Sequence, residues 1–446
     1  MTTKRAFIDA GKRILLGAGR ERERPKRTPR PSAARVGRSA VATAAVAVML
    51  AAAGCSGGGT QASPDKANLT LGFWVAGNED QAAWQKVADQ AAQDHPGITV
   101  TLQGAAWENY WSKMGTMLAS SDGPCIVGMQ SLRLPAYTQA LLPLDDLMAK
   151  YGVKAGDFDN SILDGLKSDG KQYAMPYDTG PLMIFYNRDL FQQAGIPEPK
   201  PGWTMDDFKS AANKLTAGGR HGFVADPQDV FSMPWVLDFT GAQPLKDKAL
   251  ALTDPDFVSG YQQFADLVLK DKVAQPVPSS GRDFATTEFS SGNAAMKVDG
   301  PWSVIGLRDQ VKFHVGLAPM PAGPGGSKSY TLGSGFGISK SCKNPDAAFQ
   351  AIASMTGQKA LTALAATGRA YPSRLAAQDA WYQAANIPGA RETLEFAVTH
   401  STPLITAKNW VKAADLYSRF GVQVLNGGMS VDEAMKQVQS QVGSGS

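Results

Sequence analysis

The sequence predicts an α/β protein built from more than one domain, and two observations lead to this prediction. Its 446 residues exceed the length that one hydrophobic core usually organises. Residues 68–75 and 98–102 alternate apolar and polar side chains as strands do, while residues 79–94 between them carry an apolar face at helical spacing. This order favours a parallel sheet covered by helices, whose ligands bind beyond the carboxyl ends of the strands.

The first 54 residues differ in composition from the rest of the chain. A basic stretch leads into the apolar run 40–54, which is too short for a comfortable membrane span, so a signal peptide is the better interpretation. Residues 55–66 are rich in Gly and Ser and predict a flexible tether. Residues 1–54 contain 12 of the 44 basic and 3 of the 40 acidic residues, which leaves 32 and 37 and a net charge of −5. This charge gives no reason to expect a nucleic-acid partner.

Motifs for metal or phosphate chemistry do not stand out. The cysteines are Cys55, Cys125 and Cys342, and none stands in a C-x-x-C or at zinc-ligand spacing. In an exported protein Cys125 and Cys342 could form one disulfide, but we favour two buried thiols. The glycines of residues 331–339 lack the Gly-Lys-Ser/Thr of a phosphate-binding loop. The sequence therefore predicts no cofactor and no metal.

Turn and cap residues divide the middle of the chain. Apolar strand formers occupy residues 182–186, directly after a turn or hinge composition at 177–181. Asn187 ends the strand pattern and can open a short helix. Thr204 is a plausible N-cap for a helix over 205–215, with an aspartate three positions later as a capping-box partner.

The run from Gly170 to Phe191 carries a family resemblance. It is similar to the extracellular solute-binding proteins that feed ABC sugar importers, the maltose-binding-protein-like group, in which a "GK-x-Y-x-x-P" run precedes an "x-YN-x-D-L-F" run. The residues in matching places are Gly170, Lys171, Tyr173, Pro176, Tyr186, Asn187, Asp189, Leu190 and Phe191. A second match fills every fixed position of the group's "F-x-x-G-x-A-A-M-x-x-x-G-x-W" pattern. Its residues are Phe289, Gly292, Ala294, Ala295, Met296, Gly300 and Trp302.

The resemblance implies a two-lobed periplasmic-binding-protein-like (type II) fold, with hinge-linked lobes around a central ligand cleft. The implied N-lobe comprises 67–176 with 314–356, and the implied C-lobe comprises 177–313 with 357–442. The chain would cross between them near residues 176, 313 and 357. A ligand that contacts both lobes would favour hinge closure.

A function is implied as well. Proteins of this group bind a mono- or oligosaccharide outside the cell and deliver it to an ABC transporter permease, so we expect a monomeric binding protein and no enzyme. Gly54 and Cys55 resemble the lipobox of bacterial lipoproteins, although Ala52 stands where the family most often has leucine. This implies lipid, including palmitate, on Cys55 and anchoring at the extracellular face of the cell membrane.

Candidate ligand-binding residues follow from strand ends and from the resemblance. They are Trp74, Asn78, Glu79, Trp107, Gln130, Arg133, Asp178, Trp235, Asp299, Trp302, Gly335, Phe336, Tyr371 and Trp410. Trp302 is the first choice for stacking, because a flat aromatic ring fits the C–H face of a sugar. Core packing is the alternative interpretation of Trp107 and Trp235.

Two other function classes stay open at this point. An exported glycosidase or lyase would need two carboxylates across one bond, and Asp178, Asp299 and Glu79 could mimic such a pair. A binding protein for a metal or an amino acid would need a histidine–carboxylate cluster or a clear arginine clamp. The abundant tryptophans favour carbohydrate over both.

Overall fold

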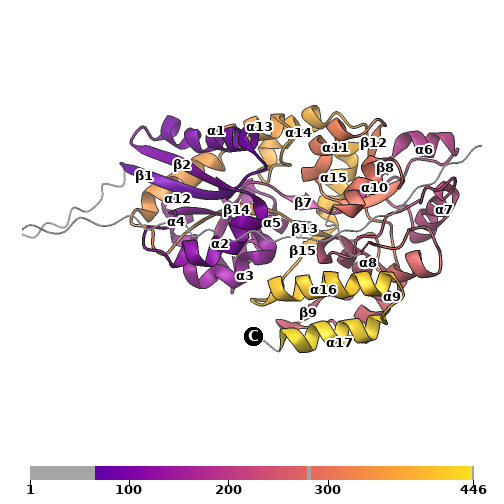
Figure 1. Cartoon of the computed structure of the whole chain (residues 1–446). Coiled ribbons are helices and arrows are strands. Elements are labelled where there is room, and N and C mark those ends of the chain that lie inside the picture. The colour runs from indigo at the N-terminus through magenta and orange to yellow at the C-terminus, as the bar shows by residue number, and fades with distance from the viewer. Residues whose placement is uncertain (1–65, 279–282, 444–446) are drawn as a thin grey trace, which may run out of the picture. The chain divides into compact units, whose positions relative to one another are not determined.

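The structure is a computed structural model that describes residues 66–278 and 283–443 (Figure 1). The first sheet contains, in spatial order, β2 (Ile98–Ala105), β1 (Ala67–Trp74), β3 (Ile126–Gln130), β14 (Ser334–Ile338) and β6 (Ala174–Pro176). β1 pairs in parallel with β2 and β3, whereas β14 is antiparallel to β3 and β6. The strand–helix–strand unit predicted at the start of the chain is confirmed, because helix α1 (Asn78–Asp94) connects β1 to β2.

Helices cover both faces of the first sheet. Alternation along β3 sends Ile126 into a core cluster shared with α1 and Val127 into a cluster shared with α2 (Trp107–Ala119). Two helices from late in the chain, α12 (Pro345–Met355) and α13 (Gln358–Ala366), pack beside α1 (Figure 1). Shorter elements of this part are α3 (Leu134–Tyr137), α4 (Asp145–Lys150), α5 (Asn160–Gly165) and the hairpin strands β4 (Lys167–Ser168) and β5 (Lys171–Gln172).

A second, three-stranded sheet is built around β8 (Met183–Asn187). Both neighbours, β11 (Met296–Asp299) and β12 (Val315–Ala318), are antiparallel to it. A smaller sheet contains β7 (Gly180–Pro181), β13 (Ser329–Leu332) and β15 (Ser401–Pro403). The continuous apolar run of β8 is fully buried, as expected of a central strand with covered faces.

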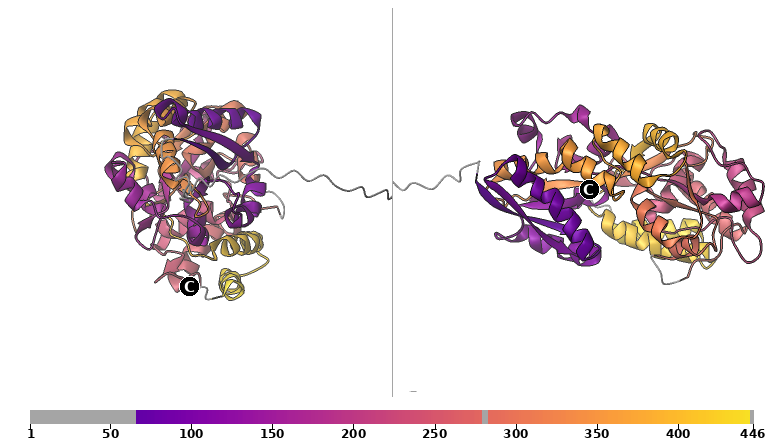
Figure 2. Two further views of the ribbon diagram at one scale, coloured as in Figure 1. Left: turned by 90° about the vertical axis from the view of Figure 1, so that its left-hand side faces the viewer. Right: turned by 90° about the horizontal axis from the view of Figure 1, so that it is seen from above.

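Helices surround the second sheet and pack against it in two core clusters. These helices include α6 (Arg188–Gln193), α7 (Met205–Leu215), α8 (Asp229–Thr240), α9 (Pro255–Leu269), α10 (Phe284–Ser290), α11 (Val304–Gln310), α14 (Gln378–Ala385), α15 (Ala390–Thr399), α16 (Trp410–Leu425) and α17 (Val431–Val442). The larger cluster includes α7, α8, α9, α16 and α17. The yellow helices α16 and α17 lie side by side in Figures 1 and 2. The short hairpin β9 (Leu245–Lys246) and β10 (Ala249–Leu250) completes this part. In the described ranges, no helix is both long and apolar enough to cross a membrane.

The chain changes sheet later than the sequence indicated. Residues 314–332 were expected to return to the first lobe, but β12 pairs with β8 and β13 pairs with β7, so the change follows at Gly333, before β14. Past residue 357, Leu361 and Leu364 still pack in the core of the first sheet. The family resemblance had implied the boundary near 313, and the pairing of β12 with β8 moves this change of sheet to Gly333.

The predicted helix starts are confirmed. Thr204 Oγ1 accepts a hydrogen bond of 3.1 Å from the N–H of Asp207, and the Asp207 carboxylate accepts one of 2.8 Å from the N–H of Thr204, so α7 begins with a full capping box. Asn187 opens α6, since its side-chain oxygen accepts a hydrogen bond of 3.1 Å from the N–H of Leu190.

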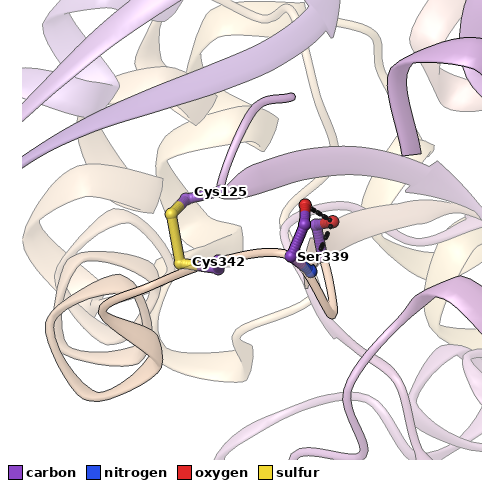
Figure 3. The surroundings of a disulfide bond; sticks show 4 residues. Cys125, Ser339 and Cys342 are labelled. Atoms are coloured by element: carbon purple, nitrogen blue, oxygen red, sulfur yellow. Dashed lines mark hydrogen bonds between the residues drawn. A yellow bond between two sulfur atoms is a disulfide. The ribbon is translucent and has the colours of Figure 1, made fainter. Parts of the chain in front are cut away.

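Cys125 and Cys342 form a disulfide, so the expectation of two free thiols was wrong (Figure 3). Cys125 directly precedes β3 and Cys342 follows β14, and these strands pair in antiparallel register with Ile126 opposite Ile338. Ser339 donates its N–H to the carbonyl of Cys125 over 2.9 Å, which extends this pairing toward the disulfide. Sheet pairing thus brings together two cysteines that are 217 residues apart in sequence, with their Cα atoms 4.5 Å apart.

Candidate functional site

A large cavity of about 1580 Å³ opens where the first sheet ends. Trp74 and Gln130 are the last residues of β1 and β3, and both line it, as expected for the carboxyl ends of parallel strands. The opposite part of its lining comes from the start of α8 and from α16, which belong to the core around the second sheet. The cavity is therefore a cleft between two separately packed cores.

Tryptophan side chains dominate one wall. Trp74, Trp107 and Trp111 contact one another with ring centroids 5.3 to 5.5 Å apart. The Arg133 guanidinium lies over this group, 4.7 Å from the Trp111 ring centroid and 5.7 Å from that of Trp107. Six of the nine tryptophans line the cleft, namely Trp74, Trp84, Trp107, Trp111, Trp302 and Trp410.

Trp302 stands apart from this wall and exposes 37% of its surface. A Cβ atom added at Gly300 would lie 2.2 Å from the Trp302 ring, and one added at Gly180 would lie 2.5 Å from it. Only glycine fits at these two positions while the ring stays where it is. The indole therefore rests on bare backbone and offers its remaining surface to the cleft.

Three carboxylates with raised pKa values form another part of the lining. Burial raises the pKa of Asp178 to about 7, against the opposing effects of the Ser334 N–H and of Arg369. Burial likewise raises the pKa of Asp226 to about 6 and that of Asp229 above its usual range. Asp229 also accepts a hydrogen bond of 3.0 Å from the indole N–H of Trp410 on α16.

The lining contains equal numbers of acidic and basic residues. Its acidic residues are Glu108, Asp178, Asp226, Asp229 and Asp415, and its basic residues are Arg133, Arg369, Lys408, Lys412 and Arg419. Arg369 donates to Asp80 over 2.6 Å, so part of its charge is already neutralised by the first lobe's helix α1. A formally neutral lining rich in indole suits a polar ligand without strong net charge.

Comparison with known proteins identifies the family. Residues 76–362 match the bacterial extracellular solute-binding proteins. The chain belongs to this family. A binding protein of Brucella abortus is 24% identical over 280 residues, which are 60% of this chain and 67% of that one.

Solved structures of solute-binding proteins share the fold. The ABC substrate-binding protein Lmo0181 from Listeria monocytogenes, in complex with cycloalternan, has a TM-score of 0.74 at 22% identity and covers 84% of this chain and 98% of its own. UgpB from Mycobacterium tuberculosis, in complex with glycerophosphocholine, has a TM-score of 0.71 at 23% identity and covers 83% and 96%. The predicted two-lobed α/β fold is confirmed, and the family places the protein outside the cytoplasm.

Half of the ligand-binding candidates lie on the cleft of this solute-binding protein. They are Trp74, Trp107, Gln130, Arg133, Asp178, Trp302 and Trp410. The side chain of Glu79 and the whole of Cys55 lie outside the described residues. Asn78 is exposed at the first position of α1 and is not part of the lining.

The remaining candidates are buried in the structure. Trp235 is fully buried among phenylalanine rings in the second core, and Phe336 is fully buried in the first. Gly335 lies inside β14, and the Tyr371 hydroxyl pairs with that of Tyr382 over 2.7 Å. Asp299 is buried against Lys297, which removes it from the carboxylate pair considered for an enzyme.

Some cleft residues were not predicted from the sequence. Asp226, Gln228 and Asp229 lie at the start of α8, and Arg369 comes from the loop after α13. The Asp-Pro-Gln-Asp run at the start of an apolar helix was the available signal, since polar side chains are concentrated there in an otherwise apolar stretch.

Proposed function

We propose that this solute-binding protein binds a mono- or oligosaccharide outside the cell and delivers it to an ABC transporter permease. The indole-lined, formally neutral cleft supports this proposal most directly. Aromatic faces stack on the C–H faces of sugar rings, while carboxylates and arginines at the edge accept and donate hydrogen bonds to hydroxyls. The cleft volume, above the few hundred to about 1,000 Å³ common for small-ligand pockets, favours an oligosaccharide.

Calorimetric titration of the purified protein tests the proposal. The panel comprises glucose, maltose, maltotriose and cycloalternan, with glycerophosphocholine as the non-sugar because a structural relative was solved with it. We expect heat from at least one sugar and recovery of that sugar unchanged by mass spectrometry. Binding of glycerophosphocholine and of none of the sugars would indicate a binding protein for a non-sugar solute. Recovery of shortened sugars would indicate a carbohydrate-active enzyme.

Delivery to a permease needs a separate test in cells. Uptake of the radiolabelled sugar that binds should fall when the gene is deleted and return with the wild-type gene. Normal uptake without the gene would contradict a transport role. We further propose that the protein acts as a monomer, which light scattering after size exclusion can check.

We also propose that Cys55 carries a lipid anchor at the extracellular face of the cell membrane. The Gly54-Cys55 junction and the tether rich in Gly and Ser after it support this. Labelled palmitate should be incorporated into the wild-type protein and not into Cys55→Ala, which should appear in the medium. Retention of the label in Cys55→Ala would contradict the proposal.

A further inference from the structure

The orientation of Trp302 depends on a turn that begins directly after β11. Trp302 lies in the single 3₁₀ turn Pro301–Ser303, in which Ser303 donates its N–H to the carbonyl of Gly300 over 3.1 Å. The turn continues directly into α11 at Val304, so that helix fixes its C-terminal end but not its N-terminal end at Gly300 and Pro301. Contacts from outside the turn must therefore keep the indole on the backbone of Gly180 and Gly300.

Asp299 supplies such contacts. One carboxylate oxygen, Oδ1, accepts a hydrogen bond of 2.7 Å from the N–H of Gly300 and another of 2.7 Å from the hydroxyl of Ser303. These two donors stand on either side of Trp302 in the chain. A single oxygen atom thus ties together both ends of the turn that carries the indole.

Lys297 in turn holds the carboxylate. Lys297 and Asp299 are two positions apart in β11 and therefore point to the same face of the sheet. The Lys297 ammonium donates to the second oxygen, Oδ2, of Asp299 and also to the Thr286 hydroxyl of α10 over 3.0 Å. Both side chains of the pair are buried.

A stabilising role alone explains this pair poorly. Taking two charges out of water is costly, and apolar side chains in place of a buried ion pair often leave stability unchanged or higher. The ion pair does hold the Asp299 carboxylate in one fixed orientation. That orientation is what the two donors flanking Trp302 require.

We infer that Asp299, held by Lys297, is a positioning residue that fixes the Trp302 ring in the cleft. Its effect on sugar affinity rests on the proposed function, but the geometric claim stands independently of any ligand. Asp299 acts through Trp302 and does not itself line the cleft.

Fluorine NMR tests the positioning directly. Protein labelled with 5-fluorotryptophan carries nine labelled indoles, and Trp302→Phe identifies the resonance of Trp302. In Asp299→Ala we expect the Trp302 resonance to shift or broaden while the other eight keep their positions. Asp299→Asn keeps an oxygen that can accept from both donors, so we expect a smaller change there; this variant also serves if Asp299→Ala does not fold.

Asp238→Ala is the matched control. Asp238 is a fully buried carboxylate of α8 that also orders a turn, because its Oδ1 accepts a hydrogen bond of 2.8 Å from the N–H of Lys328, and it does not line the cleft. Its removal should leave the Trp302 resonance in place. An unmoved Trp302 resonance in both Asp299 variants, or an equal change in Asp238→Ala, would overturn the inference.

Titration with maltotriose tests whether the position of the Trp302 ring affects sugar affinity. Asp299→Ala should weaken binding about fivefold to tenfold in the wild-type background, the range set by one aromatic contact, and should have no further effect when Trp302→Ala is already present. Equal weakening in both backgrounds would show that Asp299 acts independently of Trp302 and would overturn the inference. If the wild-type protein does not bind maltotriose, that sugar is excluded as its ligand. The NMR comparison still tests the positioning role, because it needs no ligand.

Discussion

Asp178 accepts a hydrogen bond of 2.6 Å from the backbone N–H of Ser334, and this bond joins two of the segments that connect the sheets. The segment from β6 to β7 contains Asp178, and Ser334 is the first residue of β14, directly after the link from β13 at Gly333. A third segment is tied to the first by the N–H of Thr179, which donates to the carbonyl of Tyr371 over 3.0 Å. The three connections therefore meet around the half-buried carboxylate of Asp178, which also lines the cleft.

Stability should depend on pH through Asp178. Its pKa is about 7 in the folded protein and near 4 in an unfolded chain, so the folded state binds the proton more tightly. The free energy of unfolding should therefore fall as pH rises from about 4 to 7, by at most about 1.4 kcal/mol per pH unit for this group. Asp178→Asn keeps an acceptor for the Ser334 N–H and should flatten this decline, as measured by urea unfolding at several pH values.

Asp226→Asn is the comparison for that experiment. Because the pKa of Asp226 is about 6, its contribution should be complete about one pH unit earlier than that of Asp178. An Asp178→Asn curve that runs parallel to the wild-type curve between pH 4 and 8 would show that Asp178 does not titrate in this window.

Trp302 and Trp235 should respond to substitution in opposite ways. Trp302→Ala should weaken sugar binding by about 1 kcal/mol, roughly fivefold, and leave the melting temperature nearly unchanged, because its ring is partly exposed. Trp235→Ala removes a fully buried indole and should lower the free energy of unfolding by about 3 to 5 kcal/mol while the folded fraction keeps its affinity. Calorimetric titration and urea unfolding measure both quantities, and a stability loss in Trp302→Ala as large as that in Trp235→Ala would mean that Trp302 belongs to the core.

Local signals in the sequence predicted local structure well. The alternation at β1 and β2, the cap at Thr204 and the helix start at Asn187 all depend on neighbours within a few positions, and the structure has each of them. Gly300, two positions before Trp302, also has a local reason, since the Trp302 ring occupies the space that a Cβ atom would need there. Such features need no knowledge of the rest of the chain.

Features that depend on distant pairing could not be predicted in this way. The partner of β12 and the disulfide between Cys125 and Cys342 follow from which strands lie side by side. Tryptophans posed the same difficulty, because Trp235 and Trp302 look alike in sequence, and only packing makes one a core residue and the other part of the cleft. Asp299 was predicted to bind the ligand, but it is buried and does not line the cleft, and its carboxylate accepts hydrogen bonds from Gly300 and Ser303 instead.

The disulfide should contribute measurably to stability. It closes a loop between residues 217 positions apart, and removing such a constraint typically lowers the free energy of unfolding by about 2 to 4 kcal/mol. Urea unfolding of Cys125→Ala combined with Cys342→Ala should show this loss, and dithiothreitol should lower the stability of the wild-type protein but not that of the double variant. Equal sensitivity of both proteins to the reductant would contradict the presence of the bond in solution.

Gly333 should tolerate no side chain, because it lies where the chain passes between the sheets. A Cβ atom there would be 2.7 Å from the carbonyl oxygen of Asp178 and 2.7 Å from the side chain of Ile162. Gly333→Ala should therefore lower the free energy of unfolding by about 1 to 3 kcal/mol and displace the hinge contacts of Asp178. Gly115→Ala is the matched control, since Gly115 is exposed in α2 with nothing within 4 Å, and alanine there should raise stability by about 0.5 to 1 kcal/mol. Urea unfolding should give the two variants opposite signs, and a Gly333→Ala protein as stable as wild type with unchanged sugar affinity would show that the hinge can accommodate the added methyl group.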